Sequence, residues 1–258
     1  MGRFDATMNG KSLCEIDPSV LLVDINEQTP VETFDAVSRA VYAGSLVLYR
    51  QRERLSVRLT ICIREYNVER RTQILNKISA WAGDSGWLTI STRPGQRLYV
   101  HCDTPPALGS SLRWTDEIIF SLTAYEQPYW EDEVPVVKIL DPSENPTGII
   151  THDGTAKQSY AEAYIINKGT GDLTTATIQI GNTKMAFAGL AVASGDSISI
   201  YYTDDNLLTI KAGTASALRH RTPDSDDDLI TKAGVENAIK VTADQPVQVV
   251  VMVRGRYR

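Results

Sequence analysis

Three consecutive residues, His101, Cys102 and Asp103, are of the types that carry out nucleophilic catalysis. A cysteine thiol becomes a nucleophile when a neighbouring imidazole accepts its proton through a hydrogen bond. The surrounding pattern predicts a strand over residues 98–102, however, and successive side chains of a strand point to opposite faces of the sheet. The histidine and the cysteine cannot then form that hydrogen bond. We therefore interpret the three residues as structural.

Other motifs of catalysis and metal binding are missing from the sequence. It contains no GxSxG, HExxH, Walker loop or GxGxxG motif. The cysteines, Cys14, Cys62 and Cys102, are odd in number and form no CxxC pair, which favours free thiols over a disulfide or a zinc site. The sequence thus predicts no catalytic residue, no cofactor and no enzymatic activity.

A second group of residues, Asp224, Asp226 and Asp228, has the alternate spacing with which a calcium-binding loop begins. Such a loop requires a glycine at its sixth position and a bidentate glutamate at its twelfth. Leu229 and Val235 occupy these two positions. We therefore predict a solvated acidic loop, with a weak surface cation site as the alternative, and assign no metal.

Three arginines, Arg50, Arg52 and Arg54, would share one face of a strand or of a hairpin arm, beside Tyr49. Such a stripe could contact phosphates or an acidic partner. The chain has 32 acidic and 26 basic residues, a net charge of -6, which argues against bulk binding to nucleic acid or to an anionic membrane. The stripe is then either a solvated hairpin face or a contact with an acidic patch of a neighbouring subunit.

The one adjacent aromatic pair of the C-terminal half is Tyr201-Tyr202, and residues 136–258 contain no tryptophan. Binding sites for sugars usually offer an open aromatic ring, most often tryptophan, to the apolar face of the sugar. We interpret the two tyrosines as ordinary strand residues, one facing inward and one outward.

The elements that must position these residues fall into two domains. All four tryptophans and all three cysteines precede residue 135, and a proline-containing acidic stretch over residues 131–146 follows. A length of 258 residues also favours two domains. We place the boundary at the front of this stretch, which gives domains of residues 1–133 and 134–258.

The first domain is predicted to combine strands with one helix. Apolar and polar residues alternate over residues 55–63, which is typical of a half-buried strand. Residues 68–82 have one apolar face, with Asn67 as a candidate N-cap and Gly83 at the C-terminal end, and predict a helix. Further strands are predicted in the ranges 87–91, 98–102 and 117–125.

The second domain is predicted to be an antiparallel β-sandwich. Short strands alternate with turn residues over the ranges 175–180, 184–187, 197–202 and 207–211. Gly181-Asn182 is typical of a two-residue hairpin turn. The near-continuous aliphatic run 247–253 predicts a central strand that is covered on both faces.

The order of the predicted elements resembles the distal tail proteins of long-tailed bacteriophages, the hubs at the tail tip. The resemblance to that family's first domain rests on the arginine-rich arm, the strand 55–63, the helix with Ala82-Gly83, Gly86-Trp87-Leu88, and residues 118–125 with Pro128-Tyr129-Trp130. The second half is similar to the family's galectin-like sandwich in Asp205-Asn206-Leu207, residues 233–237 and residues 254–257.

This resemblance implies a mainly β protein of two domains. The first would be a β-sandwich or barrel-like belt domain with one helix and a protruding hairpin arm, and the second a galectin-like antiparallel β-sandwich. It also implies a virion protein of the tail tip, assembled in the host cytoplasm, which forms a homo-hexameric ring. Its partners would be the tail tube protein, the tape measure protein and a tail-tip, fibre or receptor-binding protein, with no membrane and no specific nucleic acid. The arm over residues 49–54 could bridge adjacent subunits by strand addition.

A different class of function stays open at this point. The second domain could bind carbohydrate, and the protein would then be an adhesin or an accessory receptor-binding protein. The missing tryptophan and the missing galectin pattern of His, Asn, Arg and Trp on neighbouring strands argue against it.

Overall fold

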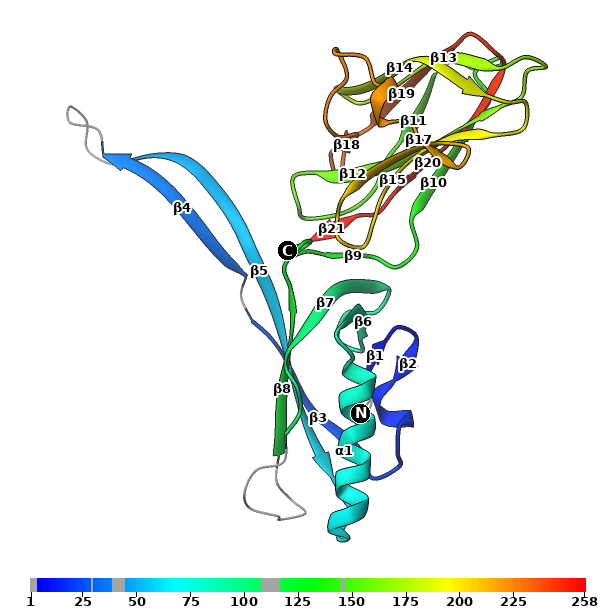
Figure 1. Cartoon of the computed structure of the whole chain (residues 1–258). Coiled ribbons are helices and arrows are strands. Elements are labelled where there is room, and N and C mark those ends of the chain that lie inside the picture. Colours follow the sequence, from blue (N-terminus) through cyan, green and yellow to red (C-terminus); the bar gives the residue numbers. More distant parts are fainter. Residues whose placement is uncertain (1–3, 29, 39–44, 108–116, 145–146) are drawn as a thin grey trace. The chain divides into compact units, whose positions relative to one another are not determined.

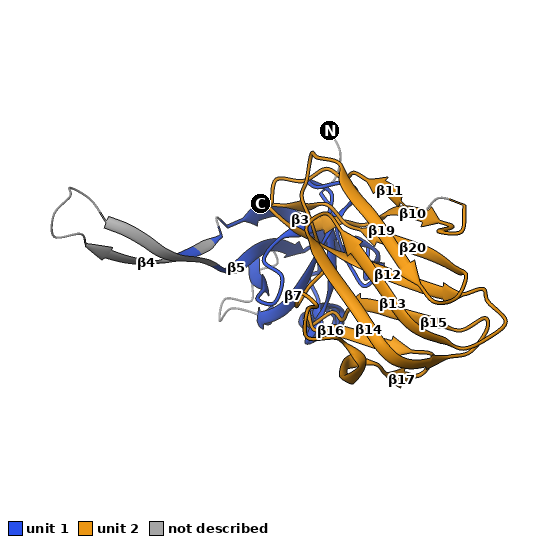
Figure 2. Cartoon of the chain, turned by 90° about the horizontal axis from the view of Figure 1, so that it is seen from above, with its two compact units in different colours: residues 1–130 blue, residues 131–258 orange. Residues whose placement is uncertain are grey.

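The computed structural model describes residues 4–28, 30–38, 45–107, 117–144 and 147–258. The chain divides into two compact units, Met1–Trp130 and Glu131–Arg258, here called unit 1 and unit 2 (Figure 2). Both units consist mainly of antiparallel strands, which confirms the predicted mainly β class. Among the described residues, no helix has the length and apolar character that crossing a membrane requires.

Unit 1 is built on one twisted antiparallel sheet. Its strands lie in the order β2-β1-β6-β7-β8-β5-β3. Their bounds are β1 (Ala6–Met8), β2 (Lys11–Ser12), β3 (Val20–Glu27), β5 (Ser45–Ile63), β6 (Ser85–Ile90), β7 (Gln96–Thr104) and β8 (Glu117–Ala124). A short 3-10 helix, η1 (Leu13–Glu15), links β2 to β3. The alternation that predicts a strand over residues 55–63 is confirmed, because every second residue of this range is buried.

The one α-helix of the described chain, α1 (Val68–Ala82), has the predicted bounds and covers one face of this sheet. The Asn67 side chain caps it by accepting a hydrogen bond from the Arg70 N–H at 3.1 Å. Trp81 lies at the other end and meets Phe120 of β8 edge to face, with ring centroids 6.3 Å apart. Because Phe120 pairs with Leu59, the buried face of β5 is the one that carries the helix.

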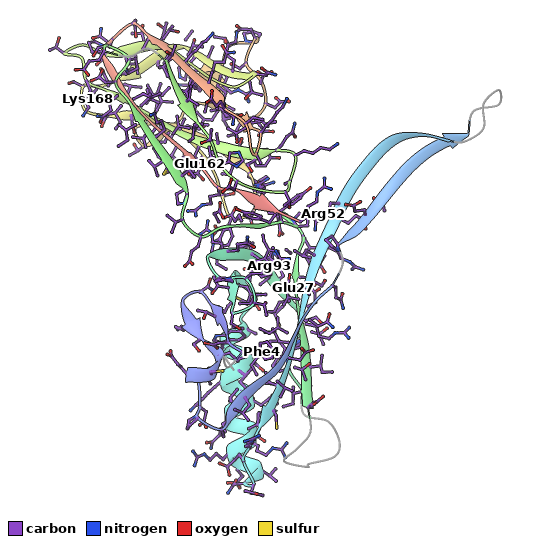
Figure 3. The ribbon with its side chains drawn as sticks, turned by 180° about the vertical axis from the view of Figure 1, so that it is seen from behind. Phe4, Glu27, Arg52, Arg93, Glu162 and Lys168 are labelled. Atoms are coloured by element: carbon purple, nitrogen blue, oxygen red, sulfur yellow. The ribbon has the colours of Figure 1, made fainter. Side chains whose placement is uncertain are left out.

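An ion pair joins distant parts of unit 1. The Arg93 Nε, in the turn between β6 and β7, lies 2.6 Å from a carboxylate oxygen of Glu27 at the end of β3 (Figure 3). The guanidinium of Arg93 also lies over the Trp130 ring, 5.2 Å from its centroid. The turn between β6 and β7 therefore contacts both β3 and Trp130, the last residue of unit 1.

Unit 2 is a β-sandwich of two antiparallel sheets. One sheet has the order β10-β20-β12-β15-β16-β17, with β18 paired to β12, and the other has the order β11-β19-β13-β14. The strands of the first are β10 (Val136–Leu140), β12 (Ser159–Asn167), β15 (Ser197–Tyr202), β16 (Leu208–Ala212), β17 (Ala215–Ser216), β18 (Ile230–Thr231) and β20 (Val247–Val253). Those of the second are β11 (Thr147–Ile150), β13 (Leu173–Ile180), β14 (Thr183–Val192) and β19 (Asn237–Ala243). Buried aliphatic residues of both sheets form one core.

Two sequence predictions for unit 2, a hairpin and a central strand, can be compared with the structure. The Gly181-Asn182 hairpin is confirmed, because Ile180 pairs with Thr183 across it and Gly181 has a φ of 58°. Strand β20 is central, as predicted, between β10 and β12. The prediction that both its faces are covered is wrong, because only every second residue is buried, and Val250 and Met252 on the other face are half-buried.

Two further short strands lie at the ends of unit 2. Strand β9 (Trp130–Asp132) begins at the last residue of unit 1, and β21 (Arg256–Tyr257) pairs with it. The Asp132 N–H donates to the Gly255 carbonyl at 3.0 Å, and the Gly255 N–H donates back to the Asp132 carboxylate at 3.0 Å. The first and last segments of unit 2 are thus hydrogen-bonded to each other.

Candidate assembly surfaces

A two-stranded ribbon, here called the arm, extends the sheet of unit 1. It consists of β4 (Val31–Ser38) and the first half of β5, paired from Val31 with Arg54 to Ser38 with Ser45 (Figure 1). The second half of β5 pairs with β8 and β3 instead, beginning at Leu55. No other described strand pairs with either edge of the arm. Its backbone donors and acceptors can therefore pair with another chain.

The arginine stripe differs from the sequence prediction. Val31 pairs with Arg54 but the next residue, Glu32, pairs with Arg52, so that β5 has an extra residue at this point. A bulge of this kind interrupts the alternation of a strand, and the period-two argument for one shared face does not hold across it. The guanidinium of Arg52 lies over the Tyr129 ring, 4.7 Å from its centroid. The side chains of Tyr49 and Arg50 lie outside the described residues.

A polar hollow of about 240 Å³ lies at the base of the arm, on strands β5, β7 and β8. Its lining includes two exposed arginines, Arg54 and Arg58, one carboxylate, Asp103, and the hydroxyl groups of Ser56 and Thr123, which hydrogen-bond at 2.8 Å. Alternate residues of β5 face α1, so these polar side chains lie on the opposite face of the sheet. Guanidinium groups with neighbouring hydroxyls are suited to bind a carboxylate.

The side chains of His101 and Asp103 are hydrogen-bonded to different partners. His101 Nε2 lies 3.0 Å from the Glu126 carboxylate, and Asp103 accepts a hydrogen bond from the Tyr125 hydroxyl at 3.0 Å. Burial raises the pKa of the Cys102 thiol, with further contributions from nearby carboxylates, whereas a nucleophilic cysteine needs a lowered pKa. Each side chain therefore has a structural partner or environment of its own.

The acidic loop is bound to strand β14 by hydrogen bonds. Asp226 accepts from the Lys184 N–H at 2.7 Å and its own N–H donates to the Lys184 carbonyl at 2.8 Å. Ser225 Oγ accepts from the Ala186 N–H at 2.9 Å. The Thr222 N–H donates to the Ala186 carbonyl at 2.9 Å. The segment 221–226 thus covers the edge of β14 in the way an additional strand would, which the prediction of a solvated loop missed.

The carboxylates of this loop turn to different partners. Asp224 accepts from Lys184 Nζ at 2.5 Å and from the Thr222 hydroxyl, and these hydrogen bonds lower its pKa to about 2. Asp228 accepts from the Tyr202 hydroxyl at 2.9 Å. Within the described residues, no group of three or more His, Cys, Asp or Glu side chains could hold a metal ion. Leu229, at the position where a calcium loop needs glycine, is fully buried in the core of unit 2.

Two tyrosines of unit 2, Tyr160 and Tyr202, pack on each other. Tyr202 is half-buried and stacks on Tyr160 of β12, with centroids 4.5 Å apart and planes 15° apart. The guanidinium of Arg256 lies over the Tyr160 ring, 4.3 Å from its centroid. Burial, followed by the charge of Asp228, raises the pKa of Tyr202. These rings are engaged within the unit and do not form an open platform for a sugar.

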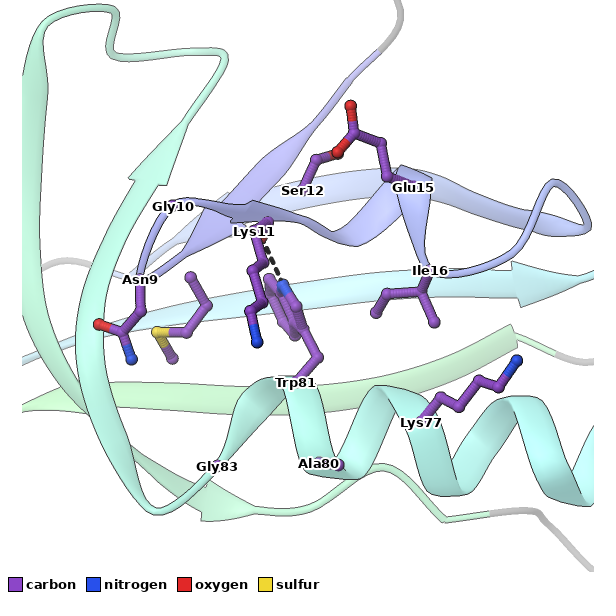
Figure 4. Close-up of a pocket in the computed structure, with 11 residues that line it drawn as sticks. Asn9, Gly10, Lys11, Ser12, Glu15, Ile16, Lys77, Ala80, Trp81 and Gly83 are labelled. Atoms are coloured by element: carbon purple, nitrogen blue, oxygen red, sulfur yellow. Dashed lines mark hydrogen bonds between the residues drawn. The ribbon is translucent and has the colours of Figure 1, made fainter.

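A second hollow of unit 1, of about 590 Å³, lies between the C-terminal end of α1 and the β1–β2 hairpin (Figure 4). Trp81 Nε1 donates to the Lys11 carbonyl at 2.6 Å and closes one wall. The hairpin turns at Asn9 and Gly10, both with positive φ, and the Asn9 side chain accepts from the Trp87 N–H at 2.9 Å. Asn-Gly is the strongest short hairpin motif, so this turn could have been predicted from the sequence.

Comparison with known proteins relates the fold to phage tail components. The chain is similar to the SPP1 Dit (gp 19.1) protein, described as a paradigm of the hub adsorption apparatus in phages that infect Gram-positive bacteria. The TM-score is 0.70 at 11% identity, over 98% of this chain and 99% of that chain. Chains of the phage p2 baseplate in its activated conformation, with Sr and with Ca, are similar at a TM-score of 0.52 and 9% identity over at least 98% of each chain.

No family model and no curated protein sequence matches the chain. At identities of 9% and 11%, a likeness of structure establishes the fold and not the activity. The two-domain, mainly β fold of the Dit protein, which the sequence resemblance implies, is confirmed.

Proposed function

We propose that the chain is a distal tail protein of a long-tailed bacteriophage, located at the tail tip of the virion. In this role it forms a hexameric ring that joins the tail tube to the tail tip, baseplate or receptor-binding apparatus. The observation that carries the proposal is the fold match to SPP1 Dit, which spans 98% of the chain and therefore includes both units. A match of a single sandwich domain would be far less specific, since many unrelated functions share that architecture.

Ring closure is assigned to unit 1 as the belt domain, and the arm is its bridging element. Both edges of the arm are without a partner among the described strands, and β4 contributes eight residues to it. Strand addition to a neighbouring subunit would supply main-chain hydrogen bonds along this length. A head-to-tail contact of this kind repeats around an axis and closes into a ring when the rotation allows it.

The polar hollow at the base of the arm offers a second contact for the same interface. Arg54 and Arg58 are exposed, and a carboxylate of an adjacent subunit would complement them. Because the chain as a whole is acidic, a neighbouring copy provides many carboxylates, whereas a nucleic acid would be repelled by most of the surface. This contact would align neighbouring subunits in the ring more than it would strengthen their binding to each other.

The remaining partners follow from this role. One face of the ring would dock the tail tube protein and the tape measure protein, and unit 2, as the galectin-like domain, would project toward a fibre or receptor-binding protein. The protein would act by binding alone, without a cofactor or a metal, and would assemble in the host cytoplasm.

Negative-stain electron microscopy of the purified protein tests the proposal. We expect rings with six-fold symmetry and a central hole, since the hub must continue the tube. A sample that stays monomeric, both alone and with the tail tube protein of the same phage, would contradict it. Binding to a glycan array by such a monomer would instead support the carbohydrate-binding adhesin.

A further inference from the structure

Strand β10 is an exposed, unpaired edge of unit 2. It is the first strand in the order of the seven-stranded sheet and pairs with β20, and no other described strand pairs with it. Val136, Val137 and Ile139 are 40%, 50% and 60% exposed, and Lys138 between them is exposed as well. Leu140 is buried and anchors the end of the strand in the core. An aliphatic edge of this length is a template for pairing with another chain.

The apolar character continues from β10 across the outer face of the sheet. Val137 pairs with Met252 of β20, and Ile139 pairs with Val250. Val250 pairs in turn with Tyr164 of β12. Met252, Val250 and Tyr164 are each half-buried and lie on the face opposite the core. A strand added beside β10 would place one more residue next to Val137 and one next to Ile139, on the same face of the sheet. These residues would bury the exposed sides of Val137 and Ile139.

The charge of Lys138 indicates which kind of strand fits. In an antiparallel pairing of β10 with a second copy of itself, the register that pairs all five residues places Lys138 opposite Lys138. Like charges directly opposite each other on paired strands are destabilising. An acidic residue at that position would instead form a favourable cross-strand pair. The edge is therefore suited to a strand of a different protein.

We propose that β10 binds an extended segment of a partner protein by strand addition, with an acidic residue opposite Lys138 and apolar residues opposite Val137 and Ile139. The inference rests on the proposed function, in that it locates where unit 2 would hold the fibre or receptor-binding protein of the tail tip. The two are tested by different observables, since ring formation is seen in images and strand addition in the exchange of the β10 amides.

The probe is an acetylated and amidated peptide, Thr-Thr-Val-Glu-Val-Thr-Thr, added to the intact chain at concentrations up to about 1 mM. Hydrogen exchange measured by mass spectrometry reports protection of the amides of residues 136–140. We expect exchange there to slow at least fivefold at saturating peptide, because edge amides that were open to water become hydrogen-bonded. The amides of β14, whose edge is covered by residues 221–226, serve as the internal control and should not change.

A charge exchange between protein and peptide tests the specificity. We expect the same peptide with lysine in place of glutamate to bind about fivefold more weakly to the native chain. The variant Lys138→Glu should reverse this preference, and its fold should be retained because the side chain is exposed. Protection of residues 136–140 with the reversed preference supports the inference. No protection at 1 mM, protection at other strands, or equal binding of both peptides to both proteins would overturn it.

Discussion

Two sheet edges at opposite flanks of unit 2 differ in whether another segment of the chain covers them. Figure 2 shows β10 and β11 at one flank and β14, β16 and β17 at the other. On the second flank, the edge of β14 is covered by the segment 221–226, whose backbone and side chains bond the N–H and carbonyl groups of Lys184 and Ala186. On the first flank, β10 exposes aliphatic residues, and no described strand other than β20 pairs with it.

Among the described sheet ends of unit 2, the edge of β14 is covered by a segment of the chain, whereas β10 and β11 each pair with one strand only. Covering the edge of β14 uses a loop of polar residues, anchored in the core by Leu229. Covered edges and charged edges are both common protections against unwanted pairing, and β10 carries the single charge of Lys138. The exposed aliphatic residues on either side of Lys138 leave β10 suited to a strand with an acidic residue opposite this lysine.

The largest effect is expected at the anchor of the covered flank. Leu229→Ala removes a fully buried side chain and leaves a cavity, so the free energy of unfolding should fall by about 3 kcal/mol. The matched control is Leu218→Ala in the same stretch, because Leu218 is 48% exposed and should cost well under about 1 kcal/mol. Urea unfolding followed by circular dichroism measures both. Equal losses for the two variants would show that the covering segment has no core anchor.

A smaller effect is expected from the hydrogen bonds that cover β14. Ser225→Ala removes the acceptor of the Ala186 N–H and should lower the free energy of unfolding by about 1 kcal/mol. It should also speed the exchange of the Ala186 amide. Asp227→Ala is the control, because this side chain is fully exposed and its ion pair with Arg221, at 3.6 Å, lies at the surface. Unchanged exchange at Ala186 in Ser225→Ala would argue against the covering role.

The covered flank should also respond to acid. Hydrogen bonds from Lys184 and Thr222 lower the pKa of Asp224 to about 2, below its value in the unfolded chain. A lowered pKa in the folded state stabilises the protein above the unfolded pKa, and this contribution is lost as the pH falls from about 4 to about 2. Asp224→Asn should remove that part of the pH dependence. Identical urea midpoints against pH for native and variant proteins would contradict the assignment.

The smallest effect on stability is expected at the open flank. Ile139→Lys changes a side chain that is 60% exposed, so the free energy of unfolding should change by less than about 0.5 kcal/mol. The change would nevertheless weaken strand addition at β10, because the apolar contact between Ile139 and a valine of the added strand would be lost. The variant should therefore keep its thermal midpoint and lose the protection by the glutamate peptide. A large loss of stability would mean that Ile139 is packed within unit 2.

Local patterns predicted much of this fold, whereas long-range packing decided the rest. The helix over residues 68–82, with its Asn67 cap, follows from one apolar face and a capping residue, both of which are local. The covering of β14 by residues 221–226 depends on contacts between segments about 40 residues apart, and only the polarity of the loop was visible in the sequence. The extra residue in β5 opposite Val31 and Glu32 likewise depends on the register of two strands.

The exposure of the aliphatic residues in β10 could not be predicted from the sequence either. Val136 and Val137 follow Pro135 and look like the start of any buried strand. Their exposure is set by the position of β10 at the end of the sheet order, which no local pattern encodes. For the arm, the resemblance implied a protruding hairpin that could bridge subunits by strand addition, and the structure adds its pairing, from Val31 with Arg54 to Ser38 with Ser45.

The central claim, a ring closed by the arm, is tested most directly by the mass of two proteins in solution. The first is the intact chain, and the second has residues 33–51 replaced by Asn-Gly, which joins the paired residues Glu32 and Arg52 through a two-residue turn. Light scattering should give the mass of a hexamer for the intact chain and of a monomer for the shortened one. An intact chain that stays monomeric both alone and with the tail tube protein, or a hexamer that persists without the arm, would contradict ring closure by the arm.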